Sequence, residues 1–374
     1  MKKVLFVIES LAGGGAEKIL TTIVKNLDKT KYDVSVLTIV KTGIYVKQVE
    51  EACNLLYILE DYETMTSPLK KMQYKSAYKK IYHADPQKVY EKYITDDYDV
   101  EIAFVEGFAT KLVAASNRPS KKYAWLHIDM IENAHADTHY QNLKEHQNAY
   151  HKYDGIYAVS DFVRQQFIRK FGDDYPVEVQ FNPVDSEEII KKAQEPIEVV
   201  RRKPVEFITV GRLVEQKGYD RLAAVTLRLK EEGYDFVIRI LGQGPMEDEL
   251  KNYISRNELE DYIELLGFKK NPYPYMKMAD AFVCSSRSEG FSTVATEALI
   301  LEKMILTTEC SGMRELFGEC ECGIIEENSK EGIYRMIKAY LDQKPDFEKI
   351  QKELTVRKEA FDLRVRMEEL GQIL

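Results

Sequence analysis

Two cations close to the end of an apolar run form the first candidate ligand site. The run Val205–Val210 leads into Gly211 and Arg212, and Lys217 follows five residues later. Parallel α/β sheets bind their ligands at the carboxyl ends of the strands. A guanidinium can grip two phosphate oxygens at once, and an ammonium adds a compact positive charge. The spacing favours a phosphate site here, and the alternative is a turn with two solvated cations.

A second stretch, residues 288–299, combines the start of a helix with two glutamates. Ser292 is expected to cap this helix, which would leave backbone amides that favour an anion such as a diphosphate. Gly290 lets the backbone approach a ligand closely. Glu289 precedes the helix and Glu297 lies within it. Because carboxylates repel phosphate, we expect these two to hold the hydroxyls of a sugar or a ribose.

An alternation of apolar runs and amphipathic stretches must position these residues. Several runs are apolar almost throughout, which is typical of parallel strands that are covered on both faces. The expected strands are Val4–Ser10, Tyr32–Val40, Leu55–Leu59, Asp99–Val105, Lys122–His127, Gly155–Ser160, Val177–Phe181, Val205–Val210, Phe236–Leu241, Ile263–Gly267, Ala281–Ser285, Met304–Thr308 and Gly323–Glu326. The clearest helical patterns are Glu17–Leu27, Asp220–Glu232, Met246–Asn257 and Lys330–Leu341. This alternation predicts an α/β fold with doubly wound sheets.

Length and composition suit two such domains. The chain has 374 residues, of which 44% are hydrophobic and 31% are charged. At roughly 150 residues per domain, that is enough for two cores. We expect a Rossmann-like domain over residues 1–185 and a second over 186–356, facing each other across a cleft. The charged C-terminal segment from Asp346 is expected to be helical, and its part from about 357 to 374 to pack back on the first domain.

Charge and cysteine content narrow the classes of function. The formal net charge of -9 argues against wrapping nucleic acid. No apolar run approaches the roughly 20 residues needed to span a bilayer. Five cysteines, odd in number and mostly scattered, suit a reduced compartment, so a cytoplasmic setting is expected.

The segment from 62 to 93 breaks the alternation, because it interleaves lysines with tyrosines. One interpretation is a solvated helical insertion. The other is a surface that docks on an anionic acceptor or, peripherally, on the cytoplasmic face of a membrane, as basic amphipathic helices do.

Taken together, these motifs resemble the family 4 retaining glycosyltransferases of GT-B fold. The resemblance is carried by Gly-Arg-x(4)-Lys-Gly at 211–218, by Glu-Gly-Phe-Ser at 289–292 with Glu297 eight residues after Glu289, and by the glycine-rich stretch at 13–17. It covers nearly the whole chain. It implies transfer of a sugar, with retention, from a nucleotide diphosphate sugar to a hydroxyl of a glycan, lipid-linked or protein-linked acceptor. A UDP-sugar is the favoured donor.

The resemblance also implies a role for each site residue. Arg212 and Lys217 would bind the donor diphosphate, Glu289 would contact the transferred sugar, and His127 would touch that sugar from the first domain. The donor-binding positions would be Gly14, Gly15, Gly211, Phe268, Gly290, Phe291, Ser292 and Glu297, the last of them at the ribose. With two cations at the diphosphate, neither a metal nor a cofactor is expected. His127 has an alternative role as a satisfied histidine at a strand end.

Two other patterns resemble metal sites. Asp97-Tyr98-Asp99 has the spelling of metal-dependent sugar transferases, but aspartate is also common in turns before strands. His135 and His139 have the i, i+4 spacing of a zinc helix but lack the intervening glutamate of the protease motif. We therefore expect structural or acceptor-lining roles for these histidines.

Rival functions on the same scaffold are a nucleotide-sugar epimerase, a phosphorylase, and a non-catalytic partner or chaperone subunit of a glycosyltransferase complex. The presence of Arg212, Lys217, Glu289 and Glu297 together counts against the non-catalytic alternative. A degenerate site would be expected to have lost some of these residues.

Overall fold

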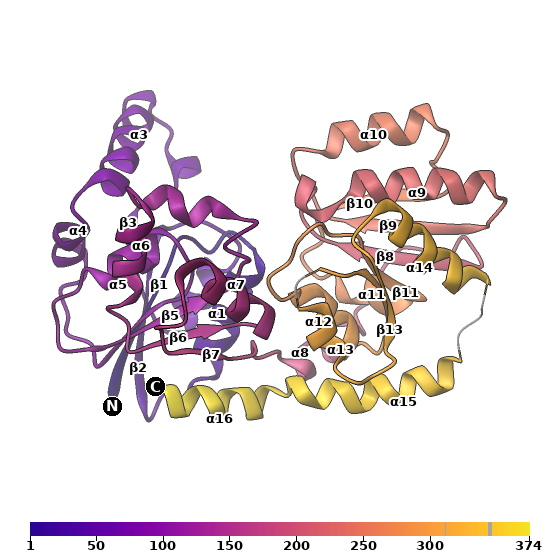
Figure 1. The fold of residues 1–374 in the computed structure, drawn as a ribbon. Coiled ribbons are helices and arrows are strands. Elements are labelled where there is room, and N and C mark those ends of the chain that lie inside the picture. The colour runs from indigo at the N-terminus through magenta and orange to yellow at the C-terminus, as the bar shows by residue number, and fades with distance from the viewer. Residues whose placement is uncertain (311, 343–345) are drawn as a thin grey trace. The chain divides into compact units, whose positions relative to one another are not determined.

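The computed structural model describes residues 1–310, 312–342 and 346–374, and these form two compact units. Unit 1 comprises Met1–Pro183 with Arg364–Leu374, and unit 2 comprises Val184–Leu363. Each unit is built on a parallel β-sheet flanked by helices, as Figure 1 shows. The predicted α/β class with two doubly wound sheets is confirmed.

The sheet of unit 1 has the strand order β3-β2-β1-β4-β5-β6-β7, and every neighbouring pair is parallel. Its strands are β1 (Lys2–Ile8), β2 (Tyr32–Val40), β3 (Asn54–Leu59), β4 (Val100–Ala103), β5 (Lys121–Leu126), β6 (Gly155–Ala158) and β7 (Val177–Val179). The central strands are apolar because helices cover both of their faces. All of these strands end at one edge, so the loops that follow them gather there.

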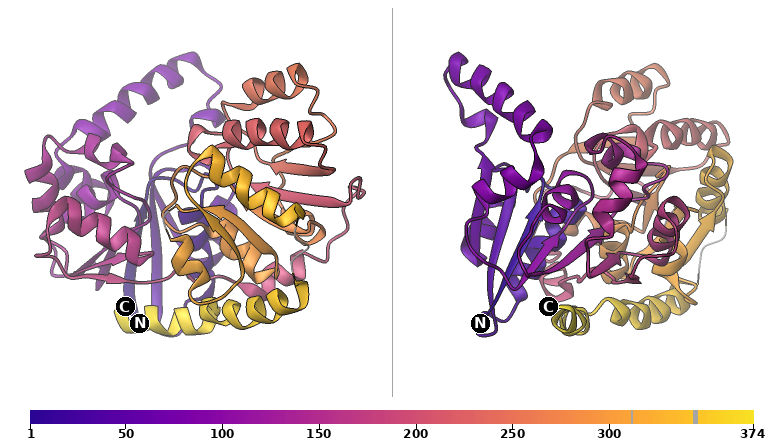
Figure 2. Two further views of the ribbon diagram at one scale, coloured as in Figure 1. Left: turned by 45° about the vertical axis from the view of Figure 1, so that its right-hand side comes forward. Right: turned by 60° about the vertical axis from the view of Figure 1, so that its left-hand side comes forward.

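The helices of unit 1 connect these strands. They are α1 (Gly15–Asn26), α2 (Val46–Ala52), α3 (Pro68–His83), α4 (Pro86–Tyr93), α5 (Phe108–Ala114), α6 (Leu143–Tyr150), α7 (Asp161–Phe171) and α16 (Leu363–Ile373), with 3-10 turns η1 (Tyr62–Thr64) and η2 (Ala134–His139). The lysine- and tyrosine-rich segment forms η1, α3 and α4. In Figures 1 and 2, α3 rises beyond the end of the sheet opposite to the N-terminus.

Unit 2 repeats the same architecture in the order β10-β9-β8-β11-β12-β13, again all parallel. Its strands are β8 (Val205–Val210), β9 (Phe236–Leu241), β10 (Ile263–Gly267), β11 (Ala281–Cys284), β12 (Met304–Thr308) and β13 (Gly323–Glu326). Its helices are α8 (Ser186–Lys192), α9 (Tyr219–Glu231), α10 (Glu247–Arg256), α11 (Tyr273–Met278), α12 (Thr293–Ile300), α13 (Met313–Phe317), α14 (Lys330–Asp342) and α15 (Phe347–Arg357), with 3-10 turns η3 (Glu215–Lys217) and η4 (Lys358–Phe361).

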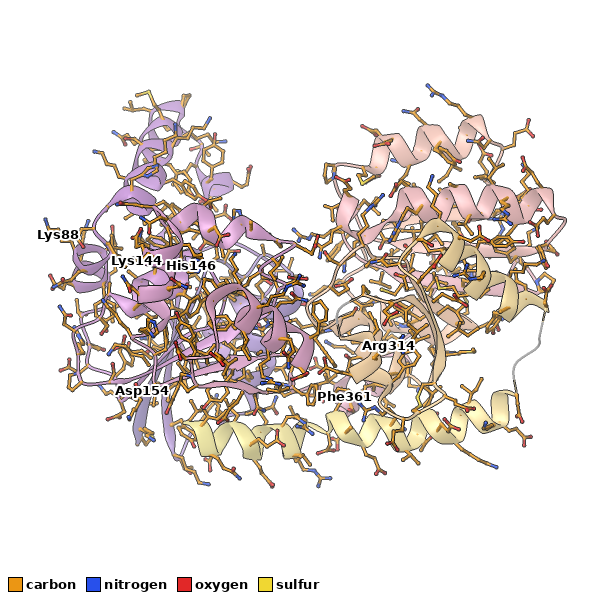
Figure 3. All side chains as sticks on the ribbon, viewed as in Figure 1. Lys88, Lys144, His146, Asp154, Arg314 and Phe361 are labelled. Carbon is orange, nitrogen blue, oxygen red and sulfur yellow. A yellow bond between two sulfur atoms is a disulfide. The ribbon has the colours of Figure 1, made fainter. Side chains whose placement is uncertain are left out.

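The C-terminal segment, expected to be helical from Asp346, forms two helices separated by η4. α15 belongs to unit 2. Phe361, labelled in Figure 3, ends η4. Its ring centroid lies 5.8 Å from that of Phe291. α16 belongs to unit 1, where Tyr32 donates a hydrogen bond to the carbonyl of Gly371 at 3.4 Å and Gln180 donates to Glu369 at 3.2 Å.

The cysteines differ in part from expectation. Cys320 and Cys322 are joined as a disulfide, and their Cα atoms are 5.2 Å apart. Cys53, Cys284 and Cys310 are free.

Within residues 1–310, 312–342 and 346–374, no helix is both long enough and apolar enough to cross a bilayer.

Candidate active site

Two loops meet at the carboxyl edge of the unit 2 sheet because β8 and β11 are neighbours. The loop after β8 is bonded to the loop after β11 by the Ser285 hydroxyl, which donates to the Lys217 carbonyl at 2.9 Å. The Gln216 side chain donates to the Ser288 carbonyl, also at 2.9 Å. These bonds bring Lys217 of the first loop to Glu289 of the second.

The centre of this arrangement is an ion pair between Lys217 and Glu289. Lys217 Nζ lies 2.5 Å from Glu289 Oε1, and the Ser286 hydroxyl donates to the same oxygen at 2.6 Å. Glu289 is only 8% exposed. Burial disfavours the charged form of Lys217, but the Glu289 carboxylate outweighs it and raises the pKa of Lys217. Lys217 is therefore a fixed cation at any physiological pH.

Glycines make room for this cation. A Cβ at Gly211 would lie 2.9 Å from the Tyr219 hydroxyl and 3.3 Å from Lys217 Cε. Gly218 has a φ of +66°, and a Cβ there would lie 2.2 Å from the Ser285 carbonyl oxygen. The close approach of the two loops thus requires Gly218, whereas Gly211 makes room for Tyr219 and Lys217 of its own loop.

Arg212 stands apart from the ion pair. Arg212 is exposed, and within the described ranges its guanidinium has no hydrogen bond or ion pair. Its planar donors therefore remain available to an anion that approaches the strand end.

The start of α12 lies in the second loop and is capped as predicted. The Ser292 hydroxyl accepts a hydrogen bond from the Ala295 amide at 3.3 Å. Phe291 is buried, and Glu297 is 2% exposed with the Tyr273 hydroxyl 3.4 Å from its Oε1. The Glu297 carboxylate is thus held inside the unit beneath the capped helix end.

Phe268 follows β10 and is 52% exposed. Gly267 before it has a φ of +67°, which turns the chain out of the strand. An exposed aromatic ring at a strand end can stack on a planar ligand such as a base.

In unit 1, the predicted glycine loop leads from β1 into α1. Gly14 is the N-cap residue and Gly15 the first residue of the helix. A Cβ at Gly14 would lie 2.4 Å from Oε2 of Glu17, so the Glu17 side chain folds over this glycine.

His127 follows β5 and is neutral. Burial lowers its pKa to about 3, although a hydrogen bond to the Phe104 carbonyl opposes the shift. Within the part of the chain that the structure describes, its Nε2 has no hydrogen-bond partner. Because the other ring nitrogen carries the proton, Nε2 can accept a hydrogen bond from a hydroxyl.

The sequence pattern gave no indication of Glu106, which holds the His127 loop. Glu106 Oε1 accepts hydrogen bonds from the amides of His127 and, at 2.9 Å, of Ile128. Burial raises the pKa of Glu106 to about 7 despite these bonds. The one feature that could have indicated Glu106 is its position two residues beyond Phe104, just after the strand that pairs with β5.

The sequence also gave no indication that Cys284 and Ser286 belong to the site. Cys284 ends β11, and its thiol lies 3.6 Å from the Ser286 hydroxyl that bonds Glu289. A hydrogen bond to Cys310, opposed by burial, lowers the pKa of Cys284 to about 7. Only the fold shows that these small residues lie next to the Lys217–Glu289 ion pair.

The residues resembling metal ligands have other partners. Asp97 pairs with Arg118 at 2.9 Å, and Asp99 accepts the Lys3 amide at 2.7 Å, both at the amino end of β4. Within the described ranges, no group of three or more His, Cys, Asp or Glu side chains is arranged to hold a metal ion.

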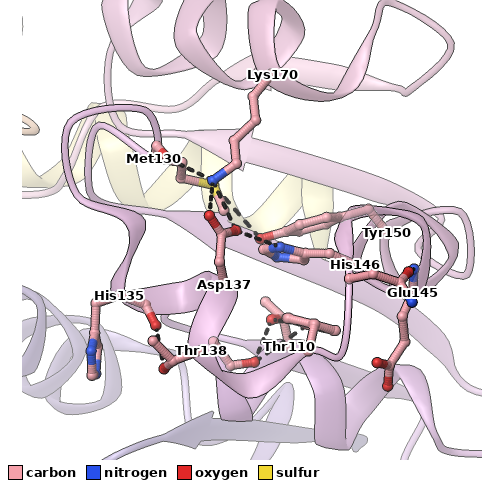
Figure 4. Close-up of polar contacts among 12 residues, drawn as sticks. Thr110, Met130, His135, Asp137, Thr138, Glu145, His146, Tyr150 and Lys170 are labelled. Carbon is pink, nitrogen blue, oxygen red and sulfur yellow. Dashed lines mark hydrogen bonds and ion pairs between the residues drawn. The ribbon is translucent and has the colours of Figure 1, made fainter.

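His135 and His139 lie in η2 with their ring centroids 5.6 Å apart. Asp137 of the same turn contacts His146 and Lys170, as Figure 4 shows. Asp137 lies 2.6 Å from Lys170 Nζ and 3.0 Å from His146 Nδ1. Burial lowers the pKa of His146 to about 4, and its ring stacks on Tyr140 at 3.8 Å between centroids. This network ties η2 to α6 and α7, which is a structural role.

Part of the chain is similar in sequence to known glycosyltransferases. Residues 190–355 match the family described as Glycosyl transferases group 1. A Campylobacter jejuni protein named N-acetylgalactosamine-N,N'-diacetylbacillosaminyl-diphospho-undecaprenol 4-alpha-N-acetylgalactosaminyltransferase is 35% identical over 187 residues, which is 50% of each chain. Escherichia coli WcaL, a putative colanic acid biosynthesis glycosyltransferase, is 32% identical over 37% of this chain and 36% of its own. The alignments thus span half or less of these relatives.

Structural similarity extends over the whole chain. The crystal structure of Anabaena Alr3699/HepE in complex with UDP and glucose has a TM-score of 0.76 at 18% identity, covering 100% of this chain and 99% of that one. At this identity the likeness establishes the fold, which is GT-B. Residues 190–355, which contain Arg212, Lys217 and Glu289, thus match the group 1 glycosyltransferases.

Proposed function

We propose that the chain is a glycosyltransferase that moves a sugar from a nucleoside diphosphate donor to a hydroxyl of an acceptor. The observation that carries this proposal is the Lys217–Glu289 pair, set beside exposed Arg212 and the capped start of α12. Cations and helix-terminal amides of this kind suit a diphosphate. UDP bound to the structurally similar HepE supports a UDP-sugar as the favoured donor.

The proposed mechanism follows from where charge develops. Breaking the bond between the anomeric carbon and the phosphate oxygen leaves the electron pair on the departing nucleoside diphosphate. Arg212, Lys217 and the amides at the start of α12 stabilise that charge in the transition state. We propose that these cations take the place of a divalent metal.

Retention follows if the acceptor attacks from the face that the diphosphate leaves. A phosphate oxygen then takes the proton of the acceptor hydroxyl as the new bond forms. Lys217 and Ser286 both bond Oε1 of Glu289, so Oε2 can accept a hydrogen bond from a sugar hydroxyl. Glu289 is thereby proposed to bind and stabilise the sugar rather than to attack it, and His127 Nε2 to accept from another hydroxyl.

The acceptor is proposed to be a glycan, lipid-linked or protein-linked molecule. The Campylobacter jejuni relative is named for a diphospho-undecaprenol acceptor, and WcaL for a polysaccharide. Both names favour an acceptor of cell-surface glycan assembly.

A panel of nucleotide sugars tests the reaction. We expect one UDP-sugar to raise the thermal unfolding midpoint and to be hydrolysed slowly in the absence of acceptor. Proton NMR of the sugar released or transferred should show the anomeric configuration of the donor in the first-formed product. An inverted first product would exclude the same-face mechanism, and stabilisation by none of the nucleotide sugars would contradict the donor assignment.

The exposed face of α3 is proposed to dock on an anionic surface, which would place the protein at the cytoplasmic face of a membrane. Lys75 and Lys79 are exposed, and the apolar side chains of Leu69 and Met72 are 59% and 64% exposed on the same helix. Lysines beside exposed apolar side chains suit the interface of an anionic bilayer.

Vesicle co-sedimentation measures this docking. Each lysine near an anionic bilayer contributes about 1 kcal/mol. Replacing Lys75 and Lys79 by alanine should therefore weaken binding to phosphatidylglycerol vesicles by roughly tenfold or more. The matched control replaces exposed Lys144 and Lys152, and should bind as the wild type does. Equal binding to neutral phosphatidylcholine vesicles would contradict an electrostatic surface.

A further inference from the structure

Arg221 is a buried arginine at the start of α9, in the same segment as Lys217. It is only 8% exposed. A Cβ added at Gly218 would lie 3.1 Å from Arg221 Nε, so the guanidinium lies against the backbone that follows Lys217. Arg221 Nη2 donates to the Ser285 carbonyl at 2.6 Å, and Nη1 donates to Asn328 Oδ1 at 2.9 Å. Arg221 therefore joins the segments that follow β8, β11 and β13 at the carboxyl edge of the unit 2 sheet.

The charge of Arg221 has no carboxylate partner. In the described segments of the chain it makes no ion pair, and its Nε has no hydrogen-bond partner. The neighbouring Asp220 is bound to Arg287, whose two terminal nitrogens donate to its two carboxylate oxygens at 2.8 and 2.7 Å. Asn328 is neutral, and its Nδ2 donates to the Arg287 carbonyl at 2.6 Å. One positive charge is thus left uncompensated beside the proposed donor site.

A buried cation without a counter-charge is unfavourable, because no ion pair offsets the loss of its hydration. Arg239, also buried in this unit, has carboxylate partners on both neighbouring strands. An anion that binds near an unpaired cation relieves the cost, since Coulomb attraction falls only with the first power of distance where water is excluded. The Lys217–Glu289 pair carries no net charge, so Arg221 adds to exposed Arg212 as a source of positive potential for such an anion.

We propose that Arg221 is a positioning residue of the donor site, which holds the Ser285 loop against Gly218 and supplies positive potential to the diphosphate from within the unit. The inference rests on the proposed glycosyltransferase function, because the anion is the diphosphate of that donor. Arg221 acts through the Ser285 carbonyl and through its charge, without touching a reacting atom. This role requires a neutral partner such as Asn328, since a carboxylate there would neutralise the guanidinium.

Asn328→Asp tests the charge while it keeps an acceptor for Arg221. The new carboxylate would accept a hydrogen bond from the guanidinium, as the amide oxygen does, and would cancel its charge. We expect this variant to bind UDP about tenfold more weakly than the wild type in isothermal titration calorimetry. A purely structural role of Arg221 would instead leave the UDP affinity of the folded variant unchanged.

Arg221→Met and Arg221→Lys separate the charge from the hydrogen bonds. Methionine removes both and should weaken UDP binding by about tenfold or more. Lysine keeps the charge, so Arg221→Lys should bind UDP more tightly than Arg221→Met. Circular dichroism and the thermal midpoint show whether the Arg221 variants are folded, and if they are not, Asn328→Asp decides by itself.

The matched control is Asn257→Asp. The side-chain amide of Asn257 also donates to a backbone carbonyl, that of Tyr253, at 2.8 Å. The substitution therefore adds the same charge and removes the same kind of bond. Asn257 lies at the opposite, amino edge of the sheet, because α10 leads from the end of β9 back to the start of β10. This variant should bind UDP as the wild type does.

Two results would overturn the role of Arg221 alone. One is wild-type affinity for UDP in folded Asn328→Asp, and the other is an equal loss of affinity in Asn328→Asp and Asn257→Asp. Absence of UDP binding by the wild-type protein would overturn the UDP donor and this role together. The wild-type titration thus distinguishes failure of the proposed function from failure of this inference.

Discussion

Lys217→Ala is expected to lower sugar transfer by about 10²–10³-fold, which corresponds to about 2.7–4 kcal/mol of lost transition-state stabilisation. Lys217 is the cation held closest to Glu289, at 2.5 Å, and its loop is bonded to the loop before α12. In the variant, the negative charge on the departing diphosphate would therefore lack a cation that the wild-type protein holds in place. The buried Glu289 would also lose its cation, which adds repulsion toward the donor.

The measurement is the initial rate of UDP release and of product formation with the donor found in the nucleotide-sugar panel. Lys251→Ala is the matched control, since Lys251 is 56% exposed on α10 of the same unit and pairs only with Glu247 of its own helix. It should leave the rate unchanged. Arg212→Ala should slow transfer comparably with little effect on folding, because its side chain is exposed. Wild-type rates in both Lys217→Ala and Arg212→Ala would contradict the donor site.

Arg239→Met is expected to destabilise unit 2 by about 3–5 kcal/mol, because it breaks a buried ion pair. Arg239 lies on β9 and Glu206 on the adjacent β8, with side chains 2% and 0% exposed. The guanidinium bonds both oxygens of Glu206 and also lies 2.9 Å from Glu264 on β10. Without it, the Glu206 carboxylate would be buried and without its main partner.

Urea unfolding followed by circular dichroism measures this loss. The double variant Arg239→Met with Glu206→Leu should recover most of the stability, because two apolar side chains replace the buried pair and the Glu264 carboxylate, 29% exposed, stays in contact with water. Arg228→Met, which breaks a half-exposed pair with Glu331 in the same unit, should cost at most about 1 kcal/mol. A similar loss in Arg228→Met and Arg239→Met would show that burial of the pair is not the cause.

Much of the fold could be predicted from the chain because its signals are local. Tyr32–Val40 and Val205–Val210 are strands with the predicted bounds, since both are short segments rich in apolar and β-branched residues. Ser292 caps α12 as predicted, because a capping hydroxyl needs only its own next turn. The motif at residues 211–218 could be recognised for the same reason, because all of its residues directly follow one strand.

The C-terminal segment shows where local signals stop. Its helical pattern extends from α15 to α16, but the two helices belong to different units. That division depends on which core each helix finds, and the helix period carries no information about it. The bonds from Tyr32 and Gln180 to α16 come from residues that are distant in the sequence.

The amino-acid sequence by itself determined the strands, the capped helix and the residue types of the donor motif, because each depends on neighbours along the chain. The tertiary structure alone brings Lys217 to Glu289, 72 residues away, and Glu106 to the amides of the His127 loop. The order of parallel strands brings these groups to a common edge, and burial then sets their charge. Both are properties of the packed chain.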